Sequence, residues 1–323
     1  MPNKILCVHR GADDDSSMYW ATADVQSDGR LVWSGDDRFM GGNAKSDEGP
    51  ALAVFNNRIY CAFRDAVSDH LMISYWDNSA RIWRSCGPIT TAAICTPGLA
   101  AWDNKLFCVY QGDKGNEMYW ASTSDPMAGQ WSFEKFPWDN QMCNRAALTI
   151  YSNRLYCFHR GQPDVNPPTE KGQECFWTAR DTGDWSNDSE FPVSMVSAAG
   201  PAGAVYAPGV GDGNELIIIK RGPLSFSSND RNIYTTRFVR DDRSHYGLTE
   251  VGATFASTDM SNVSPSLAVC GDFLYSVYPS LDDSRLRWAR WDRTTKGWAA
   301  AVDLGGHRSG REVGLLSVDG LMD

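Results

Sequence analysis

The chain has 323 residues, of which 42% are apolar and 12% aromatic, and it contains 29 Gly and 15 Pro. This composition is typical of a globular, turn-rich protein and is too apolar for a disordered chain. The formal net charge is −10 and no cluster of Lys and Arg occurs. Because phosphate binding depends on such clusters, the sequence argues against a nucleic-acid partner.

The N-terminus and the cysteines suggest the compartment. The first apolar stretch is broken by His9 and Arg10, so it lacks the apolar core of a signal peptide. No segment approaches the roughly 18 continuous apolar residues that span a bilayer, so no membrane insertion is expected. Four of the nine cysteines recur at one repeat position, which indicates buried residues in a reducing compartment rather than disulfides. We expect a cytoplasmic protein, or one released without a signal peptide.

An internal repeat carries the prediction of the fold. Each copy has an apolar strand, a tight polar turn, and a second strand that in most copies ends in a basic residue and Gly. A period of roughly 40 to 50 residues is typical of propeller blades, and positions equivalent to Cys7 recur here every 47 to 61 residues. In chain order, the clear copies are Pro50–Cys61, Gly98–Cys108 and Ala147–Cys157, and two more divergent copies are Pro201–Ile218, which has an inserted turn, and Pro265–Ser276.

A sixth copy is divided between the two ends of the chain. Gly314–Gly320 has the pattern of a first strand with its turn, and Lys4–Gly11 has the pattern of a second strand. Pairing these ends would close a ring and remove the exposed sheet edges that invite aggregation. A seventh copy is absent from the sequence, so the repeat predicts six blades.

Two more strands complete each repeat. The third carries an aromatic pair, as in Met18–Trp20, and the fourth is usually marked by a Trp. Four strands make one blade. We therefore predict an all-β fold, a single six-bladed β-propeller domain over residues 1–323. Blade 1 is split between residues 1–49 and 314–323, and the C-terminal strand closes the ring by joining the N-terminal blade.

The repeat also places a basic residue at the end of strand two and an aromatic residue on strand three. Neighbouring strands bring such side chains together, giving an aromatic face and guanidinium donors for a sugar. Packing between blades and capping of strand-end carbonyls would need the same residues, so both interpretations stay open. The pairs are Arg10 with Trp20, Arg64 with Trp76, Arg160 with Trp177 and Arg221 with Tyr234; Gln111 with Trp120 is a weakened copy, and Pro279 replaces the arginine in blade 6.

The sequence resembles the fucose-binding propeller lectins of fungi and bacteria. The resemblance rests on six short blades, an Asn-basic-aliphatic-Tyr turn, the Tyr-Trp pair and the outer Trp. The resemblance implies several sugar sites between blades, each with an Arg, an acidic residue and an aromatic residue. By residue type, the matches are Arg64 with Trp76, Arg160 with Glu174 and Trp177, and Arg10 with Trp20.

The acidic partner departs from that pattern. Only Glu117 and Glu174 directly precede the aromatic pair, and Glu117 belongs to the blade that has Gln111 in place of Arg. The expected partner is therefore fucose, another glycan or another small polar ligand, bound at repeated sites.

A second set of polar residues precedes each innermost strand and should surround one mouth of the central channel. Unlike the rest of the repeat, this set is irregular and charged, as a single asymmetric site requires. Carboxylates there suit acid and base roles, and arginines suit an anionic group. The alternative to a lectin is thus an enzyme, either a glycosidase-like hydrolase or a lyase. A disc-shaped protein that binds other proteins is a third possibility. The catalytic candidates are Asp47, Glu48, Arg145, Arg311 and Glu312.

Histidines offer no obvious metal site in the sequence. His9 and His159 occupy one repeat position in different blades, too far apart to share an ion, and His70, His245 and His307 are isolated. Neither a metal nor a cofactor is predicted. The oligomeric state cannot be derived from the sequence.

Overall fold

The computed structural model describes residues 3–91, 93–113, 115–137, 140–161, 173–191, 195–207, 213–223, 230–241, 243–244, 246–252 and 254–322. These residues are mainly β-strand, with 3-10 turns at Phe39–Gly42 (η1) and Pro126–Ala128 (η2). Within the described ranges, no helix has the length and apolar character that crossing a membrane demands. His245 lies outside the described residues.

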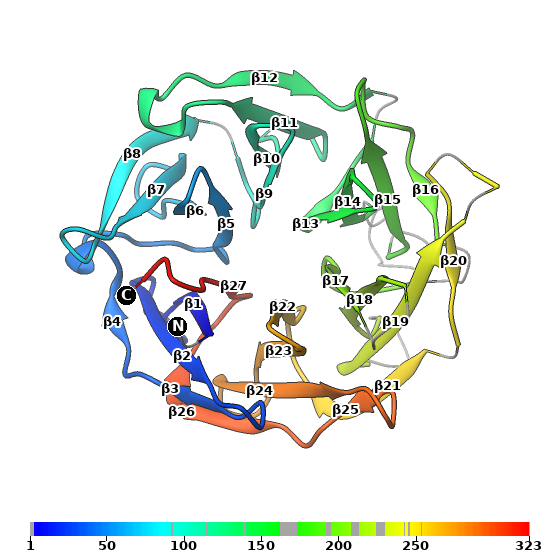
Figure 1. Ribbon diagram of the computed structural model, residues 1–323. Coiled ribbons are helices and arrows are strands. Elements are labelled where there is room, and N and C mark those ends of the chain that lie inside the picture. The colour runs from blue at the N-terminus through cyan, green and yellow to red at the C-terminus, as the bar shows by residue number, and fades with distance from the viewer. Residues whose placement is uncertain are drawn as a thin grey trace.

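Six antiparallel sheets stand around a central axis, so the predicted six-bladed β-propeller is confirmed (Figure 1). Each sheet has four strand positions, and in blades 1, 5 and 6 two strands share the outermost position. Blade 1 contains β27 (Gly314–Ser317), β1 (Lys4–Arg10), β2 (Met18–Val25), β3 (Leu31–Trp33) and β4 (Asp37–Arg38). Blade 2 contains β5 (Ala51–Phe55), β6 (Arg58–Arg64), β7 (Leu71–Asp77) and β8 (Ile82–Thr90). Blade 3 contains β9 (Gly98–Trp102), β10 (Lys105–Gln111), β11 (Met118–Thr123) and β12 (Ser132–Lys135).

The second half of the ring repeats this order from the axis outward. Blade 4 contains β13 (Cys143–Tyr151), β14 (Arg154–Arg160), β15 (Cys175–Arg180) and β16 (Ser189–Glu190). Blade 5 contains β17 (Ala202–Tyr206), β18 (Glu215–Arg221), β19 (Asn232–Arg240), β20 (Leu248–Glu250) and β21 (Phe255–Met260). Blade 6 contains β22 (Ser266–Cys270), β23 (Phe273–Pro279), β24 (Arg285–Asp292), β25 (Gly297–Trp298) and β26 (Val302–Arg308).

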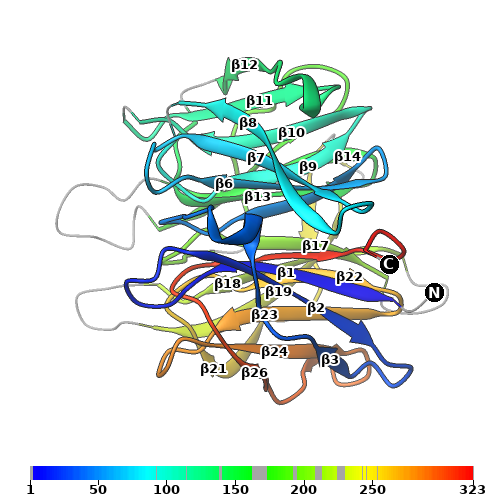
Figure 2. The ribbon, with the colours of Figure 1, turned by 90° about the vertical axis from the view of Figure 1, so that its left-hand side faces the viewer.

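The two ends of the chain meet in blade 1, as the split repeat predicted. Strand β27 pairs antiparallel with β1, with Cys7 opposite Leu315. Val318, just after β27, donates a backbone hydrogen bond to the Lys4 carbonyl (2.9 Å). Both views place the two termini next to each other beside this blade (Figures 1 and 2). The ring is therefore closed by strand pairing.

The turns between first and second strands are tight and polar, as predicted. Asn56 and Asn57 both have positive φ, 48° and 58°, and Asp103 with Asn104 repeats this at 48° and 55°. Two successive residues with positive φ define the type I′ hairpin, which matches the twist of the flanking strands. The opposite end of the blades carries the loops from second to third strands, such as residues 11–17 and 65–70. We call this end the upper face.

The core lies between neighbouring blades. The cysteines at the repeat position, Cys7, Cys61, Cys108 and Cys157, are fully buried, and all nine cysteines are free. This confirms that they are buried small residues rather than a disulfide framework. The inner strands line a channel with a cavity of about 350 Å³ whose wall is mainly Leu, Ala and Val. Polar groups are concentrated at its upper mouth.

Candidate functional site

The repeated arginines link one blade to the next. Each ends the second strand of its blade and donates a hydrogen bond to a carbonyl in the segment that leads into the next inner strand. These bonds fix the spacing of neighbouring blades at the upper face. They run from Arg10 Nη1 to Asp47 (3.4 Å), Arg64 Nε to Ala93 (3.0 Å), Arg160 Nη1 to Ala198 (2.9 Å) and Arg221 Nη1 to Asn262 (3.1 Å).

Two of these arginines make further contacts. Arg10 also donates to the carbonyls of Gly11, Asp13 and Asp15, and it thereby shapes the loop at residues 11–15. Arg64 forms ion pairs with Asp69 (2.5 Å) and Asp47 (3.6 Å). From the sequence, capping of carbonyls was one of the roles left open for these arginines. In the structure all four arginines cap carbonyls.

The tryptophans that the sequence paired with these arginines lie between blades. Trp76, Trp120 and Trp177 are buried, with exposed fractions of 6%, 4% and 5%. Trp20 of blade 1 is half-buried and packs edge-on against Trp76 of blade 2, with ring centroids 5.0 Å apart. Packing is thus observed for these rings, and a role in sugar binding stays a prediction.

A different aromatic set is accessible at the upper face. In blades 1, 3 and 5, the tyrosine near the start of the third strand is half-exposed and donates its hydroxyl hydrogen bond to a carboxylate. The three pairs are Tyr19 with Asp15 (2.8 Å), Tyr119 with Glu117 (2.7 Å) and Tyr234 with Asp230 (2.6 Å). We call these the tyrosine–carboxylate pairs.

Electrostatics keep the carboxylates of blades 1 and 3 ionised. Hydrogen bonds from Lys135 and Tyr119 lower the pKa of Glu117. Burial opposes the shift at Asp15, yet hydrogen bonds from Ser17 and Tyr19 lower the pKa of that carboxyl as well. At neutral pH the pairs of blades 1 and 3 therefore present an anionic acceptor beside a neutral phenol.

A cross-strand residue supports each ring from behind. His9 stacks on Tyr19 with centroids 5.8 Å apart, and Tyr110 stacks on Tyr119 at 5.9 Å. In blade 5, Lys220 Nζ lies 5.0 Å from the centroid of Tyr234. Each ring is therefore held in one orientation.

Blade 4 departs from this set because Phe replaces Tyr. Its Phe176 stacks on His159, with centroids 5.9 Å apart, and Glu174 is half-buried. Glu117, Glu174 and Tyr234 were predicted from the sequence as site residues, whereas Asp15 and Asp230 were not. Asp15 and Asp230 lie four residues before their tyrosines, whereas an acidic partner was expected directly before the aromatic pair.

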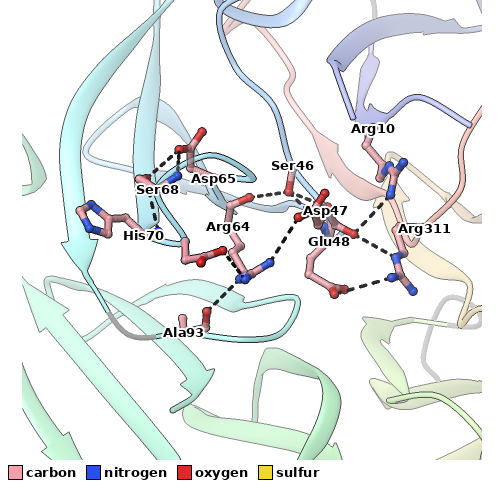
Figure 3. A network of polar contacts seen from close by, with 11 residues as sticks. Arg10, Ser46, Asp47, Glu48, Arg64, Asp65, Ser68, His70, Ala93 and Arg311 are labelled. Atoms are coloured by element: carbon pink, nitrogen blue, oxygen red, sulfur yellow. Dashed lines mark hydrogen bonds and ion pairs between the residues drawn. The ribbon is translucent and has the colours of Figure 1, made fainter. Parts of the chain in front are cut away.

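Three of the channel-mouth candidates, Asp47, Glu48 and Arg311, lie close together (Figure 3). Arg311 donates from Nε to the Asp47 carbonyl (3.0 Å), and its Nη2 lies 3.8 Å from Oε1 of Glu48. Burial raises the pKa of Glu48 to about 7, Glu312 and Asp47 add to the shift, and Arg311 and Arg64 oppose it. Glu48 is thus a carboxylic acid that titrates near neutral pH.

Arg145 reaches from blade 4 to blade 6. Its Nη1 donates to Ser266 Oγ (2.9 Å) and to the Pro265 carbonyl (3.4 Å). Burial lowers the pKa of Arg145 and the buried Glu312 opposes that shift. The five catalytic candidates therefore form one charged group around the mouth.

The expectation that His307 is isolated was wrong. Its Nδ1 lies 2.6 Å from Oδ1 of Asp36, and His9 Nε2 lies 3.1 Å from the same oxygen. This cluster could not be predicted from the sequence, because β26 and β1 belong to different repeats and meet only when the ring closes.

Comparison with known proteins adds information on the fold alone. No protein-family model matches the sequence, and no curated protein matches it. TolB from Acinetobacter baumannii is 12% identical with a TM-score of 0.57 over 98% of this chain, which spans 66% of the TolB chain.

Two further structures match over nearly their whole length. The six-bladed lectin of Aleuria aurantia, described with a fucose recognition mode, is 12% identical with a TM-score of 0.56, covering 94% of this chain and 96% of the lectin. A chain of a nidogen/laminin complex is 9% identical with a TM-score of 0.56, covering 97% and 98%. At these identities the likenesses define the class as a β-propeller.

Proposed function

We propose that this protein is a carbohydrate-binding propeller with several equivalent sites on its upper face. The observation that carries the proposal is the tyrosine–carboxylate pair in blades 1, 3 and 5. A half-exposed ring suits the apolar face of a sugar, and an ionised carboxylate accepts strong hydrogen bonds from hydroxyls.

Repetition favours a binder over a catalyst. Several weak sites on one rigid disc raise avidity without any new contact. The supported rings also favour binding, since a site that is already ordered loses little conformational entropy when the ligand arrives. The Aleuria aurantia lectin, which has this fold and a fucose recognition mode, supports a glycan as the ligand class. Fucose is one candidate among the monosaccharides to be tested.

A single-site enzyme is the second candidate, and Glu48 is the observation that favours it. A carboxyl whose pKa is about 7 suits general acid and base catalysis at neutral pH. Arg311 beside it offers a partner for an anionic substrate. This hypothesis predicts one ligand per chain and loss of activity in Glu312→Gln or Asp47→Asn.

Glycan-array screening followed by isothermal titration tests the lectin proposal. Tyr119→Ala should remove one binding site per chain and leave the other sites with unchanged affinity. Tyr75→Ala is the matched control, because Tyr75 is also half-buried but lies at the opposite end of its strand. Equal stoichiometry in wild type and Tyr119→Ala would contradict the proposal.

The arginine sites predicted from the sequence need a separate variant. Arg64→Ala removes the most accessible of the repeated arginines. If binding at the tyrosine–carboxylate pairs is the correct account, the Arg64→Ala protein should bind glycan normally once its folding is verified. Loss of a site in Arg64→Ala with no loss in Tyr119→Ala would favour the arginine–tryptophan sites instead.

A further inference from the structure

Two histidines and one aspartate from three segments meet between blades 6 and 1. His9 lies in β1, Asp36 precedes β4, and His307 lies in β26. The nearest ligand atoms of all three lie within 4.8 Å of one another. Oδ1 of Asp36 contacts both rings, at 3.1 Å from His9 Nε2 and 2.6 Å from His307 Nδ1.

The hydrogen bonding of His9 points to a cation between the rings. Its Nδ1 lies 3.0 Å from the Arg10 carbonyl, and its Nε2 faces the Asp36 carboxylate. Both partners only accept hydrogen bonds, whereas a neutral imidazole has one N–H. Donation from Nδ1 to the carbonyl leaves the Nε2 lone pair directed at Asp36. This hydrogen bond to a backbone carbonyl is typical of histidines that bind a metal through the other nitrogen.

His307 supplies a second, independent observation. Its side chain is 6% exposed, and its Nδ1 is buried without a hydrogen bond of acceptable geometry despite the close approach to Asp36. Two acceptors this close, the Nδ1 lone pair and the carboxylate oxygen, are costly unless a proton or a cation between them satisfies both. A metal ion would satisfy both.

We propose that His9, Asp36 and His307 bind one zinc ion or a similar divalent transition metal. Two imidazole nitrogens and a carboxylate oxygen are a ligand set that zinc accepts, with a further position left for water or an external ligand. Tetrahedral zinc places ligand atoms about 3.3 Å apart, so small side-chain movements complete the geometry. Asp36 is 26% exposed, which leaves a path for the ion.

Blade 4 contains a natural control. His159 Nε2 lies 3.0 Å from Oδ1 of Asp188, which repeats the His9–Asp36 contact. Among the described residues, however, only the group with His307 brings three ligand side chains together. The histidine–aspartate contact is thus a shared feature of two blades, and the third ligand distinguishes the proposed site.

Zinc binding by the full-length protein tests the proposal. Metal-free protein is titrated with Zn²⁺ against a chromophoric chelator at about pH 7.5, and with Co²⁺ followed by visible absorption. We expect one high-affinity equivalent, weakened at least about tenfold in Asp36→Asn and in His307→Gln. His159→Gln should bind Zn²⁺ like the wild type.

Thermal melts separate metal binding from folding. Zn²⁺ should raise the Tm of the wild type and of His159→Gln, because binding to the folded state alone stabilises it. His307→Gln should fold without metal but show no Zn²⁺-dependent shift, and Asp36→Asn provides the same readout if His307→Gln does not fold. Folded wild-type protein that binds no Zn²⁺, as expected if protonated rings hold Asp36, would overturn the proposal. Unchanged binding in both variants would overturn it equally.

Discussion

Removal of the C-terminal strand tests how the ring is closed. Truncation before Gly314 deletes β27, which forms four register pairs with β1. At about 1 kcal/mol net for each hydrogen bond, this ladder stabilises the fold by about 4 kcal/mol. Leu315 and Val318 are buried, and each contributes about 1.5–3 kcal/mol. The total of about 7–10 kcal/mol matches the stability of a typical protein, about 5–15 kcal/mol, so the truncated chain should be unfolded.

Circular dichroism and tryptophan fluorescence during thermal unfolding measure this effect. Truncation after Gly320 is the control, because it keeps β27 and removes only the partly buried Leu321 and Met322 with the last residue. The control should melt cooperatively at a slightly lower Tm. At about 2–4 °C per kcal/mol, the longer truncation would lower the Tm by tens of degrees. A cooperative transition within a few degrees of the full chain would refute closure by β27.

Raising the pH from about 5 to about 8 should destabilise the protein, because the folded state keeps the Glu48 proton up to about pH 7 and the unfolded chain releases it near 4.5. Urea unfolding should show a loss of up to about 3 kcal/mol over this range that is absent in Glu48→Gln; equal pH profiles would contradict this. Arg160→Met should lower the free energy of unfolding by about 0.5–1.5 kcal/mol, since the Ala198 carbonyl loses the Arg160 donor and keeps the Asn144 amide, and unchanged urea curves would exclude that link. A thiol reagent should modify at most Cys86 and Cys143 in native protein, because the other seven thiols are buried; rapid labelling of more thiols would contradict that burial.

The fold was predictable because its signals are local and repeated. Turn pairs such as Asn56–Asn57 define a hairpin within about a dozen residues. The same strand–turn–strand sequence pattern recurs in every blade. Even the closure between Cys7 and Leu315 could be predicted, since half of one repeat is found at each end of the chain.

The candidate site was only partly predictable because its contacts cross between strands and blades. Strand register places Trp20 opposite Val8 and Arg10 opposite Met18, so the predicted Arg10–Trp20 pair are not direct cross-strand partners. The carbonyl partner of each repeated arginine belongs to the next blade. Every residue type has a backbone carbonyl, so this partner cannot be recognised from the sequence. The Asp36–His307 contact likewise depends on the packing of blade 6 against blade 1.

The stoichiometry of monosaccharide binding tests the central claim most directly. Isothermal titration of the wild type should give more than one site per chain, with about three expected from the tyrosine–carboxylate pairs of blades 1, 3 and 5. A variant with Tyr19, Tyr119 and Tyr234 all replaced by Ala should fold and bind no sugar. One site per chain that survives in this variant, or no monosaccharide binding by the wild type, would contradict the account.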